Sequence, residues 1–299
     1  MTVLVVGGTG LLGRQVVTAL RREDRPVRAL VRPGSDAAAL EAAGVDVVRG
    51  DMLEPQSLPA AFSGVDAVIT SAVGYTKRRK TDRGDTDVAG NRNLADAAAR
   101  AGVRRFVLTG ILQSHLAPDV PHFWHKTLAE QDLAERSVPY VSLRPGAFFD
   151  QVMDLLPGGG PREGRMVSMW PADVRSSWVL SADVAEGLVR LVDAEVADGA
   201  TIDLGWTRPV SMEELATLAG DALGRPVRLR KLPWPVVRGV GGLIGRANDQ
   251  VGDMVAMIRF FATGRYVADL TAATELLGGV PTPEAAVRRW AGSPRLARV

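Results

Sequence analysis

The sequence predicts an α/β fold in which helices cover both faces of a parallel sheet. Three observations lead to this prediction. Short apolar runs alternate with helix-like segments from the start of the chain to Pro145. These runs are apolar on both faces, which is typical of the buried strands of parallel sheets. A glycine cluster joins the first run to the first helical pattern, an arrangement typical of doubly wound folds.

Six strands follow from the apolar runs. We expect them at 2–6, 26–31, 45–48, 66–70, 105–109 and 140–144. Helices are expected from residue 11 to about 24, from 85 to 100 with Gly102 as the C-terminal cap, and from 121 to 136. Right-handed crossovers between such strands give a doubly wound sheet, with its ligand site at the carboxyl ends of the strands.

After Pro145 this alternation is lost. A loop is expected at 156–161, and helices are expected to begin at Ser181, Ser211 and Thr282. We therefore predict a sheet domain over 1–150, to which 171–205 returns, and a small, mostly helical cap made of 151–170 and 206–299. The apolar residues of this cap, interpreted as core or as the wall of a substrate pocket, are Trp234, Met254, Met257, Phe260 and Phe261.

The composition argues against several classes of protein. The net charge of the 299 residues is only +2, which does not favour nucleic-acid binding, and the absence of cysteine excludes thiolate sites and disulfides. The three histidines lack a metal-ligand spacing, so no metal is expected. No apolar stretch is long enough for a membrane span. A strand from Thr2 leaves no room for a signal peptide, so we expect a cytoplasmic protein. The oligomeric state stays open.

The glycine cluster indicates a dinucleotide site. Gly7, Gly10 and Gly13 give the spacing G-x-x-G-x-x-G between a strand and a helix. Glycine allows a sharp turn, a close approach of the backbone to a pyrophosphate and close packing of the helix on the sheet. The N-terminus of the helix offers unpaired N–H groups to the phosphates. We therefore predict that the sheet is of the Rossmann type.

The end of the second strand indicates which dinucleotide. Sites selective for NAD usually hold an acidic residue there, bonded to the ribose 2′-hydroxyl. Here the position is Arg32, whose planar guanidinium suits a 2′-phosphate, and Arg14 could reach the same phosphate from the first helix. The alternative is that both arginines are ordinary solvated charges. We expect NADP(H).

With these motifs in place, the chain resembles an atypical short-chain dehydrogenase/reductase of the NmrA-like, NAD(P)-binding family. The resemblance covers most of the chain and is strongest over 1–150. The motifs that carry it are Gly7-Gly8-Thr9-Gly10-Leu11-Leu12-Gly13, Leu30-Val31-Arg32, Gly50-Asp51, and Leu143-Arg144-Pro145-Gly146 after a helix with Lys126 and Glu130.

The resemblance implies where the nucleotide would bind. Lys126 would bond the nicotinamide ribose, Asp51 would lie beside the adenine, and Phe148 would border the nicotinamide. The full set of cofactor-binding residues expected is Gly7, Thr9, Gly10, Leu11, Leu12, Gly13, Arg14, Arg32, Asp51, Met52, Ser71, Ala72, Val73, Thr109, Gly110, Lys126, Pro145, Gly146 and Phe148.

The sequence departs from the superfamily at its catalytic motif. Where the pattern is Tyr-x-x-x-Lys, this chain has His122-Phe123-Trp124-His125-Lys126. Residues 122 and 126 share one face of a helix, so His122 could take the place of the tyrosine as proton donor. It could equally be a first-turn residue without a role. Tyr75, after the fourth strand, is a second candidate donor. Lys126, His122 and Tyr75 are thus the candidate catalytic residues.

Two hypotheses of function remain, with a third behind them. The first is an NADPH-dependent oxidoreductase that transfers hydride to a small apolar carbonyl, enone or quinone, since activated acceptors need less help from a protein acid. The second is a catalytically silent NADP-binding protein, either a redox sensor or an assembly factor. A sugar epimerase or dehydratase is less favoured, because that chemistry depends on the missing tyrosine.

Overall fold

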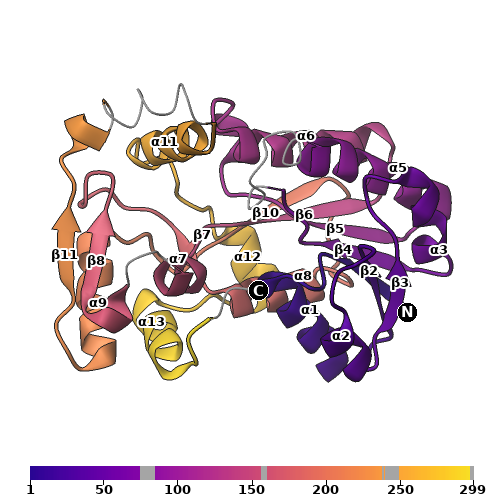
Figure 1. Cartoon of the computed structure of the whole chain (residues 1–299), viewed down its shortest axis with the longest axis horizontal. Coiled ribbons are helices and arrows are strands. Elements are labelled where there is room, and N and C mark those ends of the chain that lie inside the picture. The colour runs from indigo at the N-terminus through magenta and orange to yellow at the C-terminus, as the bar shows by residue number, and fades with distance from the viewer. Residues whose placement is uncertain (75–84, 156–159, 238, 240–248, 297–299) are drawn as a thin grey trace. The chain divides into compact units, whose positions relative to one another are not determined.

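The computed structural model describes residues 1–74, 85–155, 160–237, 239 and 249–296. The chain divides into two compact units. Unit 1 consists of Met1–Ile111, His122–Arg144 and Ala182–Ile202, and unit 2 of Leu112–Pro121, Pro145–Ser181 and Asp203–Val299. The candidate proton donor Tyr75 lies outside the described residues. Figure 1 shows the elements of both units.

Unit 1 is built on a seven-stranded sheet in the order β10-β6-β5-β4-β1-β2-β3. The strands are β1 (Val3–Val6), β2 (Val27–Val31), β3 (Asp46–Arg49), β4 (Ala67–Thr70), β5 (Arg105–Thr109), β6 (Tyr140–Pro145) and β10 (Ala200–Leu204). The pairs from β3 through β1 to β6 are parallel. The predicted fold class and its six strands are confirmed. Strand order reverses between β1 and β4, the position at which doubly wound sheets bind ligands.

The sheet of unit 1 is flanked by helices. They are α1 (Leu11–Arg22), α2 (Ala38–Ala42), η1 (Pro55–Ser57), α3 (Leu58–Phe62), η2 (Asp85–Gly90), α5 (Asn91–Ala101), α6 (Pro121–Glu135) and α8 (Ser181–Arg190). A buried apolar cluster joins α3 and α5 to the strands, with Leu4, Leu94 and Leu108 fully buried in it. A helix is present at 85–100 as predicted, but it begins with a π-helical segment rather than an α-helical one. The π-helix places Asp87 differently from an α-helical turn. Gly102 caps α5 with φ 63°, as predicted.

Unit 2 contains short strands as well as helices. Its elements are η3 (Ser114–Leu116), β7 (Ala147–Phe148), α7 (Phe149–Leu155), η4 (Pro161–Glu163), β8 (Arg165–Ser168), β9 (Trp178–Val179), α9 (Met212–Leu223), β11 (Arg228–Lys231), α11 (Asp249–Phe261), α12 (Thr271–Leu277) and α13 (Pro283–Gly292). β8 pairs with β11 and β7 with β9. The predicted caps at Ser211 and Thr282 are confirmed, since each side chain accepts a hydrogen bond from a backbone N–H three residues on.

Aromatic side chains form much of the core of unit 2. The ring of Phe149 lies 5.1 Å from that of Trp290 and 5.5 Å from that of Trp206. Phe261 stacks on Trp170 and is buried. Phe260 and Phe261 therefore belong to the core, whereas Met254 and Met257 are only partly buried. None of the helices in the described parts of the chain is both long and apolar enough to cross a bilayer.

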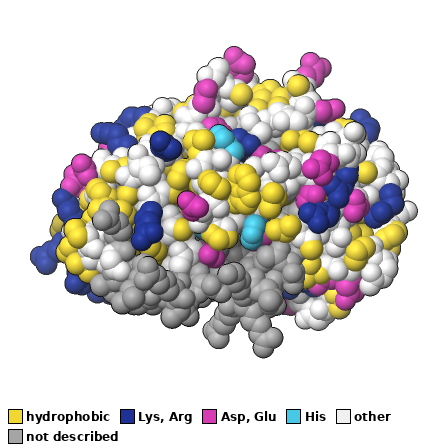
Figure 2. Space-filling model, turned by 90° about the horizontal axis from the view of Figure 1, so that it is seen from above, with side chains coloured by type: hydrophobic (Ala, Val, Ile, Leu, Met, Phe, Trp, Pro, Cys, Tyr) yellow, Lys and Arg dark blue, Asp and Glu magenta, His cyan; other side chains and the backbone are white. Residues whose placement is uncertain are grey.

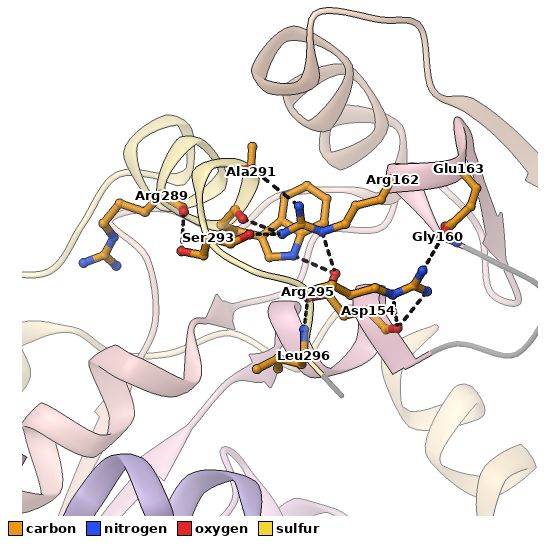
Figure 3. A network of polar contacts seen from close by, with 10 residues as sticks. Asp154, Gly160, Arg162, Glu163, Arg289, Ala291, Ser293, Arg295 and Leu296 are labelled. Carbon is orange, nitrogen blue, oxygen red and sulfur yellow. Dashed lines mark hydrogen bonds and ion pairs between the residues drawn. The ribbon is translucent and has the colours of Figure 1, made fainter. Parts of the chain in front are cut away.

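A polar network fixes the C-terminal segment of unit 2 to α7 (Figure 3). The carboxylate of Asp154 accepts hydrogen bonds from Arg162 Nε at 3.1 Å, from Trp290 Nε1 at 3.1 Å and from the backbone N–H of Leu296 at 3.0 Å. Arg162 lies over the Trp290 ring and donates to the carbonyl oxygens of Trp290 and Ser293. The side chain of Asp154 is 1% exposed, so this carboxylate is held almost entirely by protein donors.

Candidate functional site

The turn after β1 is a tight glycine loop. Gly7 has φ +90°, and its carbonyl oxygen accepts the N–H of Gly10 at 3.0 Å. A Cβ on Gly13 would lie 2.0 Å from that carbonyl oxygen and 2.8 Å from Gly8 Cα, so the helix packs on the loop at a distance that only glycine permits. α1 then begins at Leu11 without a side-chain cap at Gly10. Its first N–H groups are thus not satisfied by a capping side chain.

Three arginines lie at the glycine loop and at the ends of β2 and β3. Arg32 is exposed, and its guanidinium has no hydrogen bond or ion pair within the described part of the chain. Arg14 Nε donates to the carbonyl oxygen of Thr9 at 2.9 Å, which ties it to the glycine loop. The third is Arg49, which follows Val48 at the end of β3 and was not predicted from the sequence. Its guanidinium donates to the carbonyl oxygens of Ser35 at 2.7 Å and Arg32 at 3.5 Å.

Arg49 thereby holds the turn that carries Arg32. The turn is closed by the Ser35 N–H, which donates to the Arg32 carbonyl at 3.1 Å. The strand register pairs Val31 with Arg49. Sequence reasoning could have found Arg49 from one signal, a basic residue at the end of the strand that follows β2.

Asp51 and Met52 lie at the end of β3. Asp51 Oδ1 accepts the N–H of Leu53 at 3.0 Å, and the Asp51 N–H donates to Ser57 Oγ at 3.0 Å. Met52 is buried, and its carbonyl oxygen accepts from Asn93 Nδ2 at 2.8 Å. Part of the role of these residues is therefore to shape the loop that follows β3.

The segment after β4 lies directly beside the glycine loop. Ser71 N–H donates to the Val6 carbonyl at 3.0 Å, and a Cβ on Gly7 would lie 2.9 Å from Ser71 Oγ. The carbonyl oxygen of Ala72 accepts a hydrogen bond from Lys126 Nζ at 3.2 Å. Val73 is 44% exposed. The structure thus brings Gly7, Ser71, Ala72 and Lys126 together, as a nucleotide site at the switch between β1 and β4 requires.

Lys126 is buried, with 2% exposure, among acidic side chains. Burial lowers the pKa of its ammonium, and the charges of Asp87 and Glu130 oppose that fall. Asp87 is a residue that the sequence analysis missed. It lies in the π-helix η2, is 2% exposed, and its Oδ1 accepts the N–H of Gly74 at 2.5 Å. His125 Nδ1 lies 3.8 Å from Asp87 Oδ2.

Glu130 makes a second buried cluster at the ends of β5 and β6. Its carboxylate accepts from Ser142 Oγ at 2.7 Å and from Arg144 Nε at 2.9 Å, and Arg144 Nη2 completes a bidentate pair at 2.5 Å. Gly110 packs on this cluster, because a Cβ there would lie 2.6 Å from Ser142 Oγ. Thr109 is buried, and its Oγ1 has no hydrogen-bond partner among the residues described. A polar ligand at this strand end could supply one.

The remaining predicted residues lie as follows. His122 is partly buried on α6 and packs edge-on against the ring of Phe123, with centroids 4.8 Å apart. Pro145, Gly146 and Phe148 fall in unit 2. A Cβ on Gly146 would lie 2.5 Å from the Ser177 carbonyl oxygen, so this glycine is required by packing within unit 2. The described residues contain no group of His, Asp and Glu side chains that could hold a metal ion.

The residues of unit 1 fit an adenine dinucleotide phosphate. The glycine loop lets a pyrophosphate come close to the backbone, and Arg32 is an uncommitted cation where the sequence analysis expects a 2′-phosphate. On the face seen in Figure 2, charges of both signs are mixed and neither sign forms a broad patch among the atoms coloured by type.

Comparison with known proteins gives a match to a family model. The model described as the NmrA-like family matches residues 1–277. The NAD(P)H azoreductase of Xenophilus azovorans is 33% identical over 229 residues, which are 76% of this chain and 75% of that protein. The photosystem II assembly factor Ycf39 of Synechocystis sp. is 30% identical over 240 residues, which are 80% of this chain and 72% of that protein.

Solved structures share the fold. The triphenylmethane reductase of Citrobacter sp. superposes with a TM-score of 0.79 at 20% identity, covering 98% of this chain and all of that one. An NADPH-dependent quinone oxidoreductase of Escherichia coli, complexed with NADPH, gives a TM-score of 0.77 at 20% identity, covering 97% of this chain and 98% of that one. At these identities the likeness establishes the fold.

Proposed function

The chain belongs to the NmrA-like family, and we propose that it is an NADPH-dependent reductase that transfers hydride to a small apolar carbonyl, enone or quinone. The similarity to an NAD(P)H azoreductase over three quarters of both chains supports reductase chemistry in general. The choice of NADPH and of the acceptor class is our own inference from the site.

One observation carries the proposal. The glycine loop and the uncommitted guanidinium of Arg32 lie at the ends of the neighbouring strands β1 and β2. A pyrophosphate can bind beside the loop only if the backbone can come close to it. An adenosine 2′-phosphate requires a cation that is not already paired. Charge-assisted hydrogen bonds of this kind contribute about 1.5–3 kcal/mol, or roughly tenfold to a hundredfold in affinity.

The candidate site residues of unit 1 each have a role in this proposal. The N–H groups at the start of α1 bind phosphate, Arg32 binds the 2′-phosphate, and Lys126 binds the ribose next to the nicotinamide. NADPH, when bound, supplies the hydride that the acceptor takes up. Acceptance of hydride by a carbonyl or quinone places negative charge on oxygen, which a proton donor such as His122 can neutralise. His122 need not act where the acceptor is already activated.

The test measures binding before turnover. Calorimetry with NADPH and NADH is expected to give tighter binding of NADPH to the unaltered protein, and Arg32→Ala is expected to lose about tenfold or more of that preference. Arg100→Ala is the matched control, because Arg100 is an exposed arginine at the end of α5. Binding of neither nucleotide would refute the proposal.

Turnover is then tested with a panel of quinones, enones and azo dyes by NADPH absorbance. Lys126→Ala should weaken NADPH use. His122→Phe should lower the rate with unactivated carbonyls if His122 donates the proton. An unchanged rate with every acceptor would remove His122 from the mechanism.

A second function has support from two observations. The similarity to a photosystem II assembly factor, together with histidine in place of the tyrosine, favours a catalytically silent NADP-binding protein. Tight NADPH binding without oxidation across the whole panel would favour this alternative. Capture of a defined protein partner only in the presence of NADPH would then establish it.

A further inference from the structure

The sequence motifs do not explain how the buried ammonium of Lys126 can stay charged. A buried ammonium is costly unless it is paired, and this one is 2% exposed. The hydrogen bond to the Ala72 carbonyl satisfies a donor but supplies no negative charge. A buried carboxylate must therefore act as the counterion if Lys126 is to stay charged.

Two buried carboxylates, Asp87 and Glu130, lie near enough to Lys126 to raise its pKa, and one of them is already neutralised. Glu130 makes a bidentate pair with Arg144 and accepts from Ser142, so its charge and most of its acceptor sites are used. Within the part of the chain that the structure describes, the Asp87 carboxylate makes no hydrogen bond or ion pair with an arginine or lysine. It accepts the Gly74 N–H and faces the imidazole of His125 at 3.8 Å. Asp87, Lys126, Glu130 and Arg144 together carry two positive and two negative charges.

We propose that Asp87 is the positioning residue of this site, which acts as the counterion of Lys126 and, together with it, fixes the segment 72–74. The two side chains hold this segment from opposite ends, because Lys126 binds the Ala72 carbonyl and Asp87 binds the Gly74 N–H. The inference deepens the proposed function, since Lys126 is the residue proposed to bind the nicotinamide ribose.

The π-helical turn explains how Asp87 reaches this place. Residues 85–90 form η2, and the carbonyl oxygen of Asp87 accepts from Asn91 Nδ2 at 2.8 Å. π-turns within helices are frequent at functional sites, where they redirect a side chain. Among the described residues, the charged and titratable groups around the pair are His125 and Glu130 from α6 and, through Glu130, Arg144 from β6.

The composition makes a direct test practical. The chain has only four lysines, at 77, 80, 126 and 231. In protein labelled with 13C-lysine, the Lys126 resonance can be assigned from Lys126→Arg and titrated by NMR without any nucleotide. Asp87→Asn removes the charge but keeps an oxygen that can accept the Gly74 N–H. The expected result is a downward shift in the Lys126 titration, with about a tenfold or greater loss of proton affinity.

The matched control is Asp132→Asn. Asp132 is an equally buried carboxylate on α6, but it pairs with Arg92 and Arg136 rather than Lys126. Its removal should leave the Lys126 titration unchanged. An Asp87→Asn titration equal to that of the unaltered protein would overturn the proposal and leave Glu130 as the counterion.

A second measurement covers the case in which Asp87→Asn does not fold. If the two residues are partners, the double variant Asp87→Asn with Lys126→Met carries no unpaired buried charge and should regain folding. A double variant that folds no better than the single one would contradict the pairing. In Asp87→Asn protein that folds, NADPH affinity should fall as pH rises, because Lys126 loses its proton earlier. If the unaltered protein does not bind NADPH but Asp87→Asn still shifts the Lys126 titration as expected, the proposed function is refuted and the pairing of Asp87 with Lys126 stands.

Discussion

Removing the carboxylate of Asp154 should destabilise unit 2 more than any other single change in its polar network. Asp154→Ala deletes the acceptor of three hydrogen bonds, from Arg162, Trp290 and Leu296 (Figure 3). The bonds from Trp290 and Leu296 contribute about 1 kcal/mol each. The ion pair with Arg162 is largely buried. Arg162 keeps three carbonyl acceptors, so loss of the pair costs about 1–2 kcal/mol rather than the full penalty of an orphaned charge.

The expected loss of unfolding free energy is therefore about 3–4 kcal/mol. Urea unfolding measures it directly, and with a slope near 3 kcal/mol per molar the midpoint should fall by about 1 M. Circular dichroism should accompany tryptophan fluorescence, because Trp290 is itself a partner of Asp154.

Asp173→Asn is the control for this measurement. Asp173 is exposed in the same unit, and its replacement should change stability by less than about 0.5 kcal/mol. If the unfolding free energies of Asp154→Ala and Asp173→Asn differ by less than about 1 kcal/mol, the network does not stabilise the unit in the way argued from its geometry.

Two predictions concern the nucleotide site. Gly13→Ala places a Cβ 2.0 Å from the Gly7 carbonyl oxygen, so it should cost about 1–3 kcal/mol of stability and abolish measurable NADPH binding. In the control Gly10→Ala the same distance is 3.3 Å, and the cost should be less than about 1 kcal/mol. Equal urea midpoints for the two variants would contradict the steric argument. Arg49→Gln should release the Arg32 turn and lower the NADPH-over-NADH preference about tenfold, with partial recovery in Arg49→Lys. A preference unchanged in calorimetry would remove Arg49 from nucleotide selection.

Local sequence pattern was sufficient for the first half of the fold. Strands buried on both faces are continuous apolar runs, and the glycine spacing has a steric cause that is visible in the chain itself. The same holds for the caps at Ser211 and Thr282 and for Gly102, because each depends on contacts within a few residues. Arg32 was identifiable because its position relative to the loop is set by the length of one βαβ unit.

The short strands of unit 2 were not predictable in this way. β7 and β9 have two residues each, and β8 and β11 pair across some sixty residues of intervening chain. Such short segments carry no periodicity of their own, and they become strands only when tertiary packing brings their partners alongside. The Asp154 network likewise joins α7 to residues near 290, a connection without a local signal.

The sequence alone determined that this chain forms a doubly wound sheet with a glycine loop and an arginine after the second strand, since each of these follows from spacing along the chain. Only the tertiary structure decided which charges meet. Asp87 comes beside Lys126, and Arg49 beside the Arg32 turn, because adjacent strands and helices bring together residues far apart in sequence. The pattern of one segment carries no information about the counterion that another segment supplies.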